Sequence, residues 1–117
     1  MDLSVLIVDD HEDFRRSAGA LLELGGFRVI GEARDAAEAL TNAREMRPDI
    51  VLLDIQLPDV DGFTIAERIA LLDDPPVIIL VSSHDGVVYG SRLAASPARG
   101  FIAKRHLSGA ALASLLA

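Results

Sequence analysis

The chain of 117 residues is long enough for one domain that buries about two-thirds of its unfolded surface. Its 18 acidic and 11 basic residues give a net charge of −7, which argues against a general nucleic-acid-binding surface. The absence of cysteine excludes disulfides and thiolate metal sites, and no run of about 18 apolar residues offers a membrane span. We therefore expect residues 1–117 to form a single cytoplasmic domain that contacts neither membranes nor nucleic acid.

Short apolar runs alternate along the chain with segments of helical periodicity. The central runs are rich in β-branched residues and do not alternate with polar ones, as expected for strands covered on both faces. In chain order, the patterns predict a strand at 5–8, a helix at 12–24, a strand at 27–31, a helix at 36–46, a strand at 50–53, a helix at 63–72, a strand at 77–81, a helix at 86–95, a strand at 100–103 and a helix at 108–116.

Local signals mark the ends of several of these helices. Gly25 and Gly26 stop the first helix, and Asp35 and Ser108 are candidate N-caps of the second and the last. Gly90 weakens the fourth helix, because glycine is a poor helix former. Strand and helix alternate five times, which predicts a parallel sheet with helices on both faces.

Charged and hydroxyl side chains directly follow four of the predicted strands. Asp9 and Asp10 follow the first, Asp54 the third, Ser82 the fourth and Lys104 the fifth. Each has an ordinary explanation when taken singly, as a helix cap, a loop residue or a solvated charge. Because ligands of such sheets bind outside the carboxyl ends of the strands, their joint placement predicts a functional site at this edge.

The charges of this site indicate a metal ion. Two carboxylates about 4 Å apart repel each other by roughly 4 kcal/mol at an effective dielectric constant near 20. Lys104 supplies one positive charge, too few for three acids. The oxygen ligands, with His11, His84 and His106 scattered along the chain, suit a hard cation such as Mg²⁺. A carboxylate beside Mg²⁺, with lysine and serine donors opposite, is equipped to accept a phosphoryl group.

The segments LIVDDHEDFR, LLDIQLPDVDGF, ILVSS and GFIAKRHLSGAAL resemble a response-regulator receiver domain of two-component signalling, in the style of LuxR/NarL-type regulators. The resemblance covers nearly the whole chain. It implies a flavodoxin-like (βα)5 fold, an α/β doubly wound parallel sheet of five strands in the order 2-1-3-4-5. It also implies a phosphoprotein switch rather than an enzyme, which receives its phosphoryl group from a sensor histidine kinase or a phosphotransfer protein and catalyses only its own phosphorylation and dephosphorylation.

The same resemblance implies roles for individual residues around the acids. Asp54 is the phosphoacceptor. Mg²⁺ is held by Asp9, Asp10, Asp54 and the backbone carbonyl of Gln56. Gln56 and His84 flank the acceptor and are expected to tune how readily water reaches the acyl phosphate.

The remaining implied roles concern the switch. Ser82 is the switch hydroxyl, Lys104 contacts the phosphoryl group, and Phe101 matches the aromatic switch position. The chain departs from the family at two points. Arg105 stands where most receivers have proline, and Phe101 has no hydroxyl, so its coupling has to rest on packing alone.

The surface expected to change on phosphorylation is the 86–116 face, through which a homodimer or another partner would bind. Val87, Val88, Tyr89 and Arg92 lie near one another on it, and we expect at least one of the valines to be part of the core.

Two other classes of function remain as alternatives. The main one is a receiver-fold interaction module that works without phosphorylation, although degenerate receivers usually lose an acid or the lysine, and this chain keeps both. An enzyme is the other, but a flavin site needs a phosphate-binding loop where Asp9 and Asp10 stand, and an aspartyl phosphatase needs a second acid at Gln56. The length fits a stand-alone regulator as well as a receiver from a longer protein, and the first is favoured.

Overall fold

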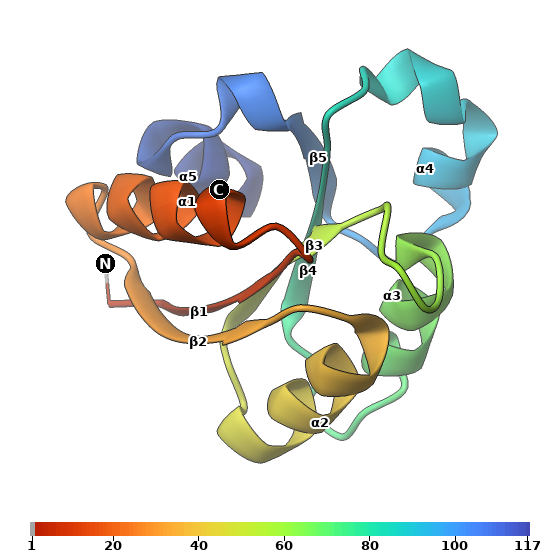
Figure 1. Ribbon diagram of the computed structural model, residues 1–117, viewed down its shortest axis with the longest axis horizontal. Coiled ribbons are helices and arrows are strands. Elements are labelled where there is room, and N and C mark those ends of the chain that lie inside the picture. Colours follow the sequence, from red (N-terminus) through yellow and green to blue (C-terminus); the bar gives the residue numbers. More distant parts are fainter. Residues whose placement is uncertain (1) are drawn as a thin grey trace.

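The computed structural model describes residues 2–117, which fold into one five-stranded sheet covered by helices (Figure 1). Neighbouring strands are parallel, and their order is β2-β1-β3-β4-β5. The predicted α/β fold and strand order are therefore confirmed. The strands are β1 (Ser4–Val8), β2 (Arg28–Ala33), β3 (Ile50–Asp54), β4 (Val77–Ser82) and β5 (Gly100–Ala103).

Outside the segment 86–95, the helices begin and end within two residues of the predicted bounds. The Asp35 side chain accepts a hydrogen bond from the Glu38 amide at 2.8 Å, and Ser108 caps the last helix through the Ala111 amide at 3.0 Å. In the described part of the chain, no helix is both long enough and apolar enough to cross a membrane. The helices are α1 (Glu12–Leu24), α2 (Ala36–Met46), α3 (Gly62–Ala70), η1 (Gly86–Tyr89), α4 (Ser91–Ala95), η2 (Lys104–His106) and α5 (Gly109–Leu116), η1 and η2 being short 3₁₀ turns.

The prediction of one continuous helix at 86–95 is wrong. Gly90 separates η1 from α4. Its φ of +55° and ψ of −133° define a backbone conformation that residues with a Cβ rarely adopt. In η1 it is Tyr89 that packs against the core, whereas Val87 and Val88 are 86% and 64% exposed. The expectation that one of these valines lies in the core is wrong as well.

The core lies on both faces of the sheet. In β1, Val5 and Ile7 pack with α1 and α5, whereas Leu6 and Val8 pack with α2 and α3. The same two helix pairs are seen on opposite faces in Figure 1. Because both faces are covered, every residue of β1 and β3 is buried, which explains why their sequences do not alternate.

The approach of α1 to α5 depends on two glycines. A Cβ atom added to Gly109 would lie 2.6 Å from the Cα atom of Gly25, and the reverse distance is the same. Contacts this short force the backbones apart. Small residues at this crossing thus set the distance between the two helices.

Gly109→Ala is expected to lower the free energy of unfolding by about 1–3 kcal/mol, because the two helices must separate. Urea unfolding measures the change. Gly19→Ala is the matched control, since its Cβ would meet only the Ile7 Cδ1 atom at 3.9 Å, an ordinary contact. The control is expected to stabilise the helix by roughly 0.5–1 kcal/mol. Equal effects of the two variants would show that the glycine contact does not limit the packing.

Candidate functional site

The carboxyl ends of three strands bring Asp9, Asp54 and Lys104 together. Asp9 is fully buried and Asp54 is 2% exposed. The Lys104 Nζ atom lies 2.5 Å from Asp9 Oδ2 and 3.5 Å from Asp54 Oδ2. Val8 pairs with Leu53 in the sheet, so the residues that follow them emerge side by side. The predicted convergence of these three charges is thus seen in the structure.

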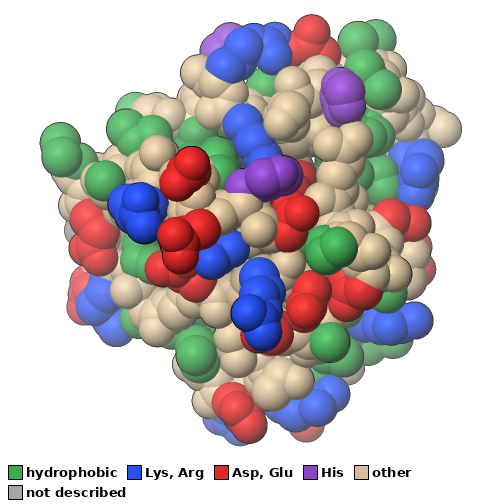
Figure 2. Space-filling view, in the orientation of Figure 1, with side chains coloured by type: hydrophobic (Ala, Val, Ile, Leu, Met, Phe, Trp, Pro, Cys, Tyr) green, Lys and Arg blue, Asp and Glu red, His purple; other side chains and the backbone are tan. Residues whose placement is uncertain are grey.

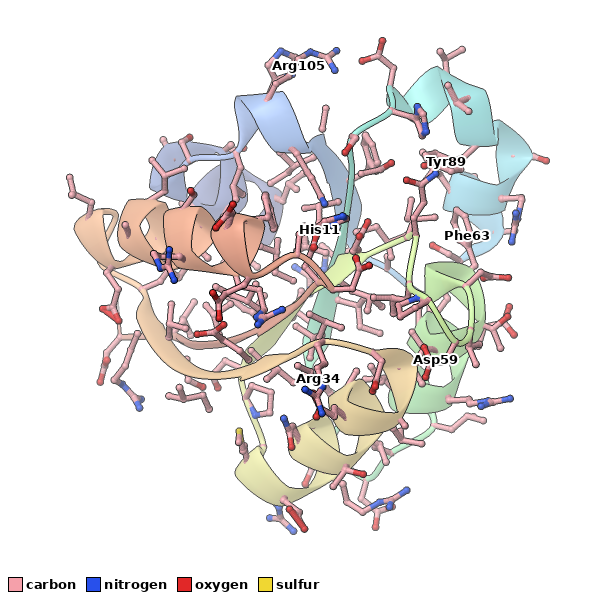
Figure 3. The ribbon with its side chains drawn as sticks, in the orientation of Figure 1. His11, Arg34, Asp59, Phe63, Tyr89 and Arg105 are labelled. Carbon is pink, nitrogen blue, oxygen red and sulfur yellow. The ribbon has the colours of Figure 1, made fainter. Side chains whose placement is uncertain are left out.

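His11 joins this group, although the histidines were expected to be scattered. Its Nδ1 atom is 3.1 Å from Asp9 Oδ1 and 3.1 Å from Asp10 Oδ1. Ligand atoms of Asp9, Asp10, His11 and Asp54 all lie within 4.8 Å of one another. Figure 2 shows a histidine flanked by acidic and basic side chains near the middle of the visible face, and Figure 3 labels His11 there. The position of His11 directly after Asp9 and Asp10 in the sequence could have predicted this contact.

The loop after β3 holds the Asp54 carboxylate by backbone contacts. The Gln56 amide donates to Asp54 Oδ1 at 3.1 Å, and the Gly62 amide donates to the Ile55 carbonyl at 2.7 Å. A Cβ on Gly62 would lie 2.5 Å from the Asp54 carbonyl oxygen, so glycine lets the start of α3 pack against the end of β3. The role of the Gln56 carbonyl as a metal ligand stays a prediction.

Burial raises the pKa of Asp54 from 3.8 to about 6, and the neighbouring charge of Asp9 adds to this effect. The Gln56 amide and Lys104 act in the opposite direction but are outweighed. The pair of buried acids is therefore costly to keep ionised with a single lysine beside it.

The donor set of the site fits a hard divalent cation. Asp9 Oδ2 is buried and accepts no hydrogen bond from any described residue, although the Lys104 Nζ atom lies 2.5 Å away as an ion-pair partner. Three carboxylates face one lysine, which leaves negative charge to be neutralised. Carboxylate oxygens of this kind are the ligands that Mg²⁺ prefers.

Ser82 lies at the end of β4, and its fully buried side chain contacts Tyr89, a pairing that the sequence did not predict. Ser82 Oγ is 2.5 Å from the Tyr89 hydroxyl and accepts a hydrogen bond from the His84 amide at 3.1 Å. The Tyr89 ring packs edge-on against Phe63, with centroids 5.7 Å apart, and lies 6.2 Å from the Phe101 ring. Figure 3 labels Tyr89 and Phe63 close to each other, with Tyr89 above Phe63 in this view. The predicted switch residues Ser82 and Phe101 are thus bridged by Tyr89.

The two basic residues that begin η2 have different environments. The Lys104 Nζ atom is 4.4 Å from the centroid of the Phe14 ring, so α1 helps to position it over the acids. Arg105 turns away and pairs with the exposed Asp85, and its guanidinium lowers the pKa of that carboxyl. Arg105 therefore stands outside the acidic group, at the upper edge of the molecule in Figure 3.

The fold and this acidic edge define a class: a flavodoxin-like α/β domain with its polar residues at the carboxyl ends of the strands. A family model described as the response regulator receiver domain matches residues 5–115. The chain belongs to this family, the receiver domains of two-component response regulators.

Similar proteins include a Pseudomonas aeruginosa protein named as a transcriptional regulator, which is 37% identical over 101 residues covering 86% of this chain and 49% of that protein. A two-component response regulator of the LuxR family from Aurantimonas sp. SI85-9A1 has a TM-score of 0.86 at 30% identity, covering 97% of this chain and 81% of that one. The signal receiver domain of NarL from Mycobacterium tuberculosis has a TM-score of 0.85 at 31% identity, covering 98% and 97%. The chain spans about half the length of the curated relatives that head the comparison.

Proposed function

We propose that Asp54 accepts a phosphoryl group from a phosphohistidine of a sensor histidine kinase or phosphotransfer protein, and that the domain changes conformation in response. The observation that carries this proposal is the buried contact of Lys104 with Asp9 and Asp54, at 2.5 and 3.5 Å. Removing one member of a buried cluster of charged side chains is costly, whereas replacing the whole cluster by apolar residues is often neutral or stabilising. Its presence therefore supports a chemical role rather than a structural one.

In the transfer, an ionised Asp54 oxygen attacks phosphorus, the N–P bond of the donor breaks, and the imidazole nitrogen keeps the electron pair. With a pKa of about 6, Asp54 is mostly ionised at neutral pH and is available as the nucleophile. Lys104 is placed to contact the phosphoryl oxygens. Asp9, Asp10, Asp54 and the Gln56 carbonyl would hold Mg²⁺, which when bound would supply positive charge to offset the negative charge of the phosphoryl oxygens.

Incubation with Mg²⁺ and acetyl phosphate, followed by intact mass spectrometry, tests this proposal. The wild type is expected to gain the mass of one phosphoryl group, and chelation of the metal is expected to prevent the gain. Asp59→Asn is the control, because Asp59 lies in the same loop but accepts hydrogen bonds from the Ala36 and Ala37 amides at the start of α2. No gain by the wild type would favour an interaction module that works without phosphate.

We extend the proposal to the switch. A phosphoryl group on Asp54 attracts the Ser82 hydroxyl, which must then change its contact with Tyr89. Because Tyr89 packs between α3 and β5, this movement reaches the 86–116 face, where the exposed Val87 and Val88 offer apolar surface for a second copy or a partner. The relative from Pseudomonas aeruginosa is named as a transcriptional regulator, which supports a transcriptional output for the protein that carries this domain.

Tyr89→Phe is expected to lower stability by about 1 kcal/mol, because it removes one hydrogen bond and keeps the ring. It is also expected to favour the switched conformation before phosphorylation, since the bond that restrains Ser82 is gone. Hydrogen exchange of residues 82–95, with and without beryllofluoride, should then show a smaller difference than in the wild type. Ser83→Ala is the control, as Ser83 is exposed. An undiminished difference in Tyr89→Phe would mean that this bond does not restrain the switch.

A further inference from the structure

His11 is held against the acids from two directions. Its amide donates to Asp9 Oδ1 at 2.8 Å, and its Nδ1 atom lies 3.1 Å from carboxylate oxygens of both Asp9 and Asp10. The ring sits at the mouth of the acidic group, with the side chain 70% exposed (Figure 3). Neither the family resemblance nor the proposed function gives His11 a role.

The spacing of these atoms is that of neighbouring ligands on one ion. Two ligands about 2.1 Å from a metal, at right angles to each other, are about 3.0 Å apart, and at the tetrahedral angle about 3.4 Å apart. The two distances of 3.1 Å from His11 Nδ1 fall in this range. All four ligand atoms lie within 4.8 Å of one another, and two of them belong to the exposed side chains of Asp10 and His11.

A second observation points to a ligand at this position. Asp9 Oδ2 is fully buried and accepts no hydrogen bond from the described residues, although the Lys104 Nζ atom lies 2.5 Å away, so the carboxylate that His11 contacts keeps a free lone pair for a metal ion. Three oxygen donors and one imidazole nitrogen form a set that differs from an all-oxygen magnesium site. Imidazole is a good ligand for Zn²⁺ and Co²⁺, whereas Mg²⁺ prefers oxygen and retains water.

We propose that His11 is a nitrogen ligand that gives this acidic site a preference for transition ions, with Zn²⁺ and Co²⁺ binding more tightly than Mg²⁺. The inference rests on the cation site of the proposed function and adds a selectivity to it. With Zn²⁺, the Nδ1 lone pair binds the ion, and the ring proton resides on Nε2, which the exposed side chain can present to water. With Mg²⁺, the imidazole remains a hydrogen-bond partner of the carboxylates. Zn²⁺ therefore competes with Mg²⁺ for the same acids.

Calorimetric titration of the metal-free protein with Zn²⁺, Co²⁺ and Mg²⁺ tests the selectivity. His11→Ala is expected to lose at least about tenfold in affinity for Zn²⁺ and Co²⁺, the loss that removing even an outer-shell partner causes, and much less for Mg²⁺. His106→Ala, which changes an exposed histidine outside the acidic group, should bind all three ions as the wild type does. Unchanged Zn²⁺ affinity in His11→Ala, or an equal loss for Zn²⁺ and Mg²⁺, would overturn the proposal.

A second measurement needs no substitution. The chain has three histidines, so ¹⁵N-labelled imidazole groups give a simple nuclear magnetic resonance spectrum. Zn²⁺ is expected to shift the Nδ1 signal of His11 and leave His84 and His106 in place, whereas Mg²⁺ should leave all three as hydrogen-bonding or free nitrogens. A His11 signal unaltered by saturating Zn²⁺ would refute the nitrogen ligand. If Mg²⁺ still supports phosphoryl uptake in that case, only this inference fails; if none of the three ions binds, the proposed cation site fails with it.

Discussion

Asp54→Asn is expected to make the metal-free protein more stable at neutral pH, by on the order of 2–3 kcal/mol. The Asp54 carboxylate is 2% exposed, and its pKa is raised from 3.8 to about 6, mainly by burial and then by the charge of Asp9. Asparagine keeps the shape and the oxygen that accepts from the Gln56 amide, but it carries no charge. The substitution thus removes the cost of ionising a buried group.

The pH dependence of this effect has a definite sign. Since the folded state binds the Asp54 proton more tightly than the unfolded state, this group makes the wild type less stable as the pH rises from 3.8 to about 6, with no further change above. The gain from Asp54→Asn should therefore be absent at low pH and complete at neutral pH. Urea unfolding in the presence of a chelator, repeated across this range, measures it.

Asp59→Asn provides a control of opposite sign. The pKa of Asp59 is lowered, first by the hydrogen bond from the Ala36 amide, so its charge stabilises the folded state above the unfolded pKa. This variant should be less stable than the wild type at neutral pH, and the difference should disappear in acid. If Asp54→Asn were instead destabilised at neutral pH, the site would hold its carboxylates without strain and would not need a cation.

Lys104→Ala is expected to destabilise the metal-free protein by about 3–5 kcal/mol at neutral pH, because it leaves two buried acids without their positive partner. It also removes the contact of the ammonium with the Phe14 ring. The loss should be smaller at pH values below about 6, where Asp54 takes up a proton. Added Mg²⁺ should restore part of the stability. Chemical unfolding with and without Mg²⁺ measures both effects.

Arg105→Ala is the matched control for Lys104→Ala. Arg105 is the next residue in the chain and also pairs with an acid, but its partner Asp85 is exposed, so little change in stability is expected.

The Lys104→Ala variant should still take up a phosphoryl group on Asp54, yet its response to beryllofluoride in residues 82–108 should be weakened. Equal stability changes in the two variants would show that the buried acids do not depend on Lys104.

The sequence predicted those features that depend on the local pattern of apolar and polar residues. The runs without alternation predicted strands covered on both faces, and the residues after them predicted the acidic edge, because parallel strands end on the same side. Asp35 and Ser108 cap their helices as expected, since a cap depends on residues three positions apart. These features need no knowledge of distant contacts.

The features that were missed depend on contacts between elements or on one unusual backbone angle. The positive φ of Gly90 breaks the predicted helix and leaves Val87 exposed. The Tyr89–Ser82 bond arises only once η1 folds back over the end of β4. The three histidines, 11, 84 and 106, are far apart in sequence, so they did not predict a common site. His11 instead contacts Asp9 and Asp10, the two acids that directly precede it.

The role of Asp54 as the residue that carries the phosphoryl group can be tested on the protein itself. Its most direct test is to treat the protein with acetyl phosphate and Mg²⁺, reduce the acyl phosphate with borohydride, and locate the reduced residue by peptide mass spectrometry. We expect conversion of Asp54 to homoserine, with Asp9 and Asp10 recovered unchanged. Reduction at Asp9 or Asp10, or a phosphoryl group found on Ser82 or His11 with Asp54 unmodified, would contradict it.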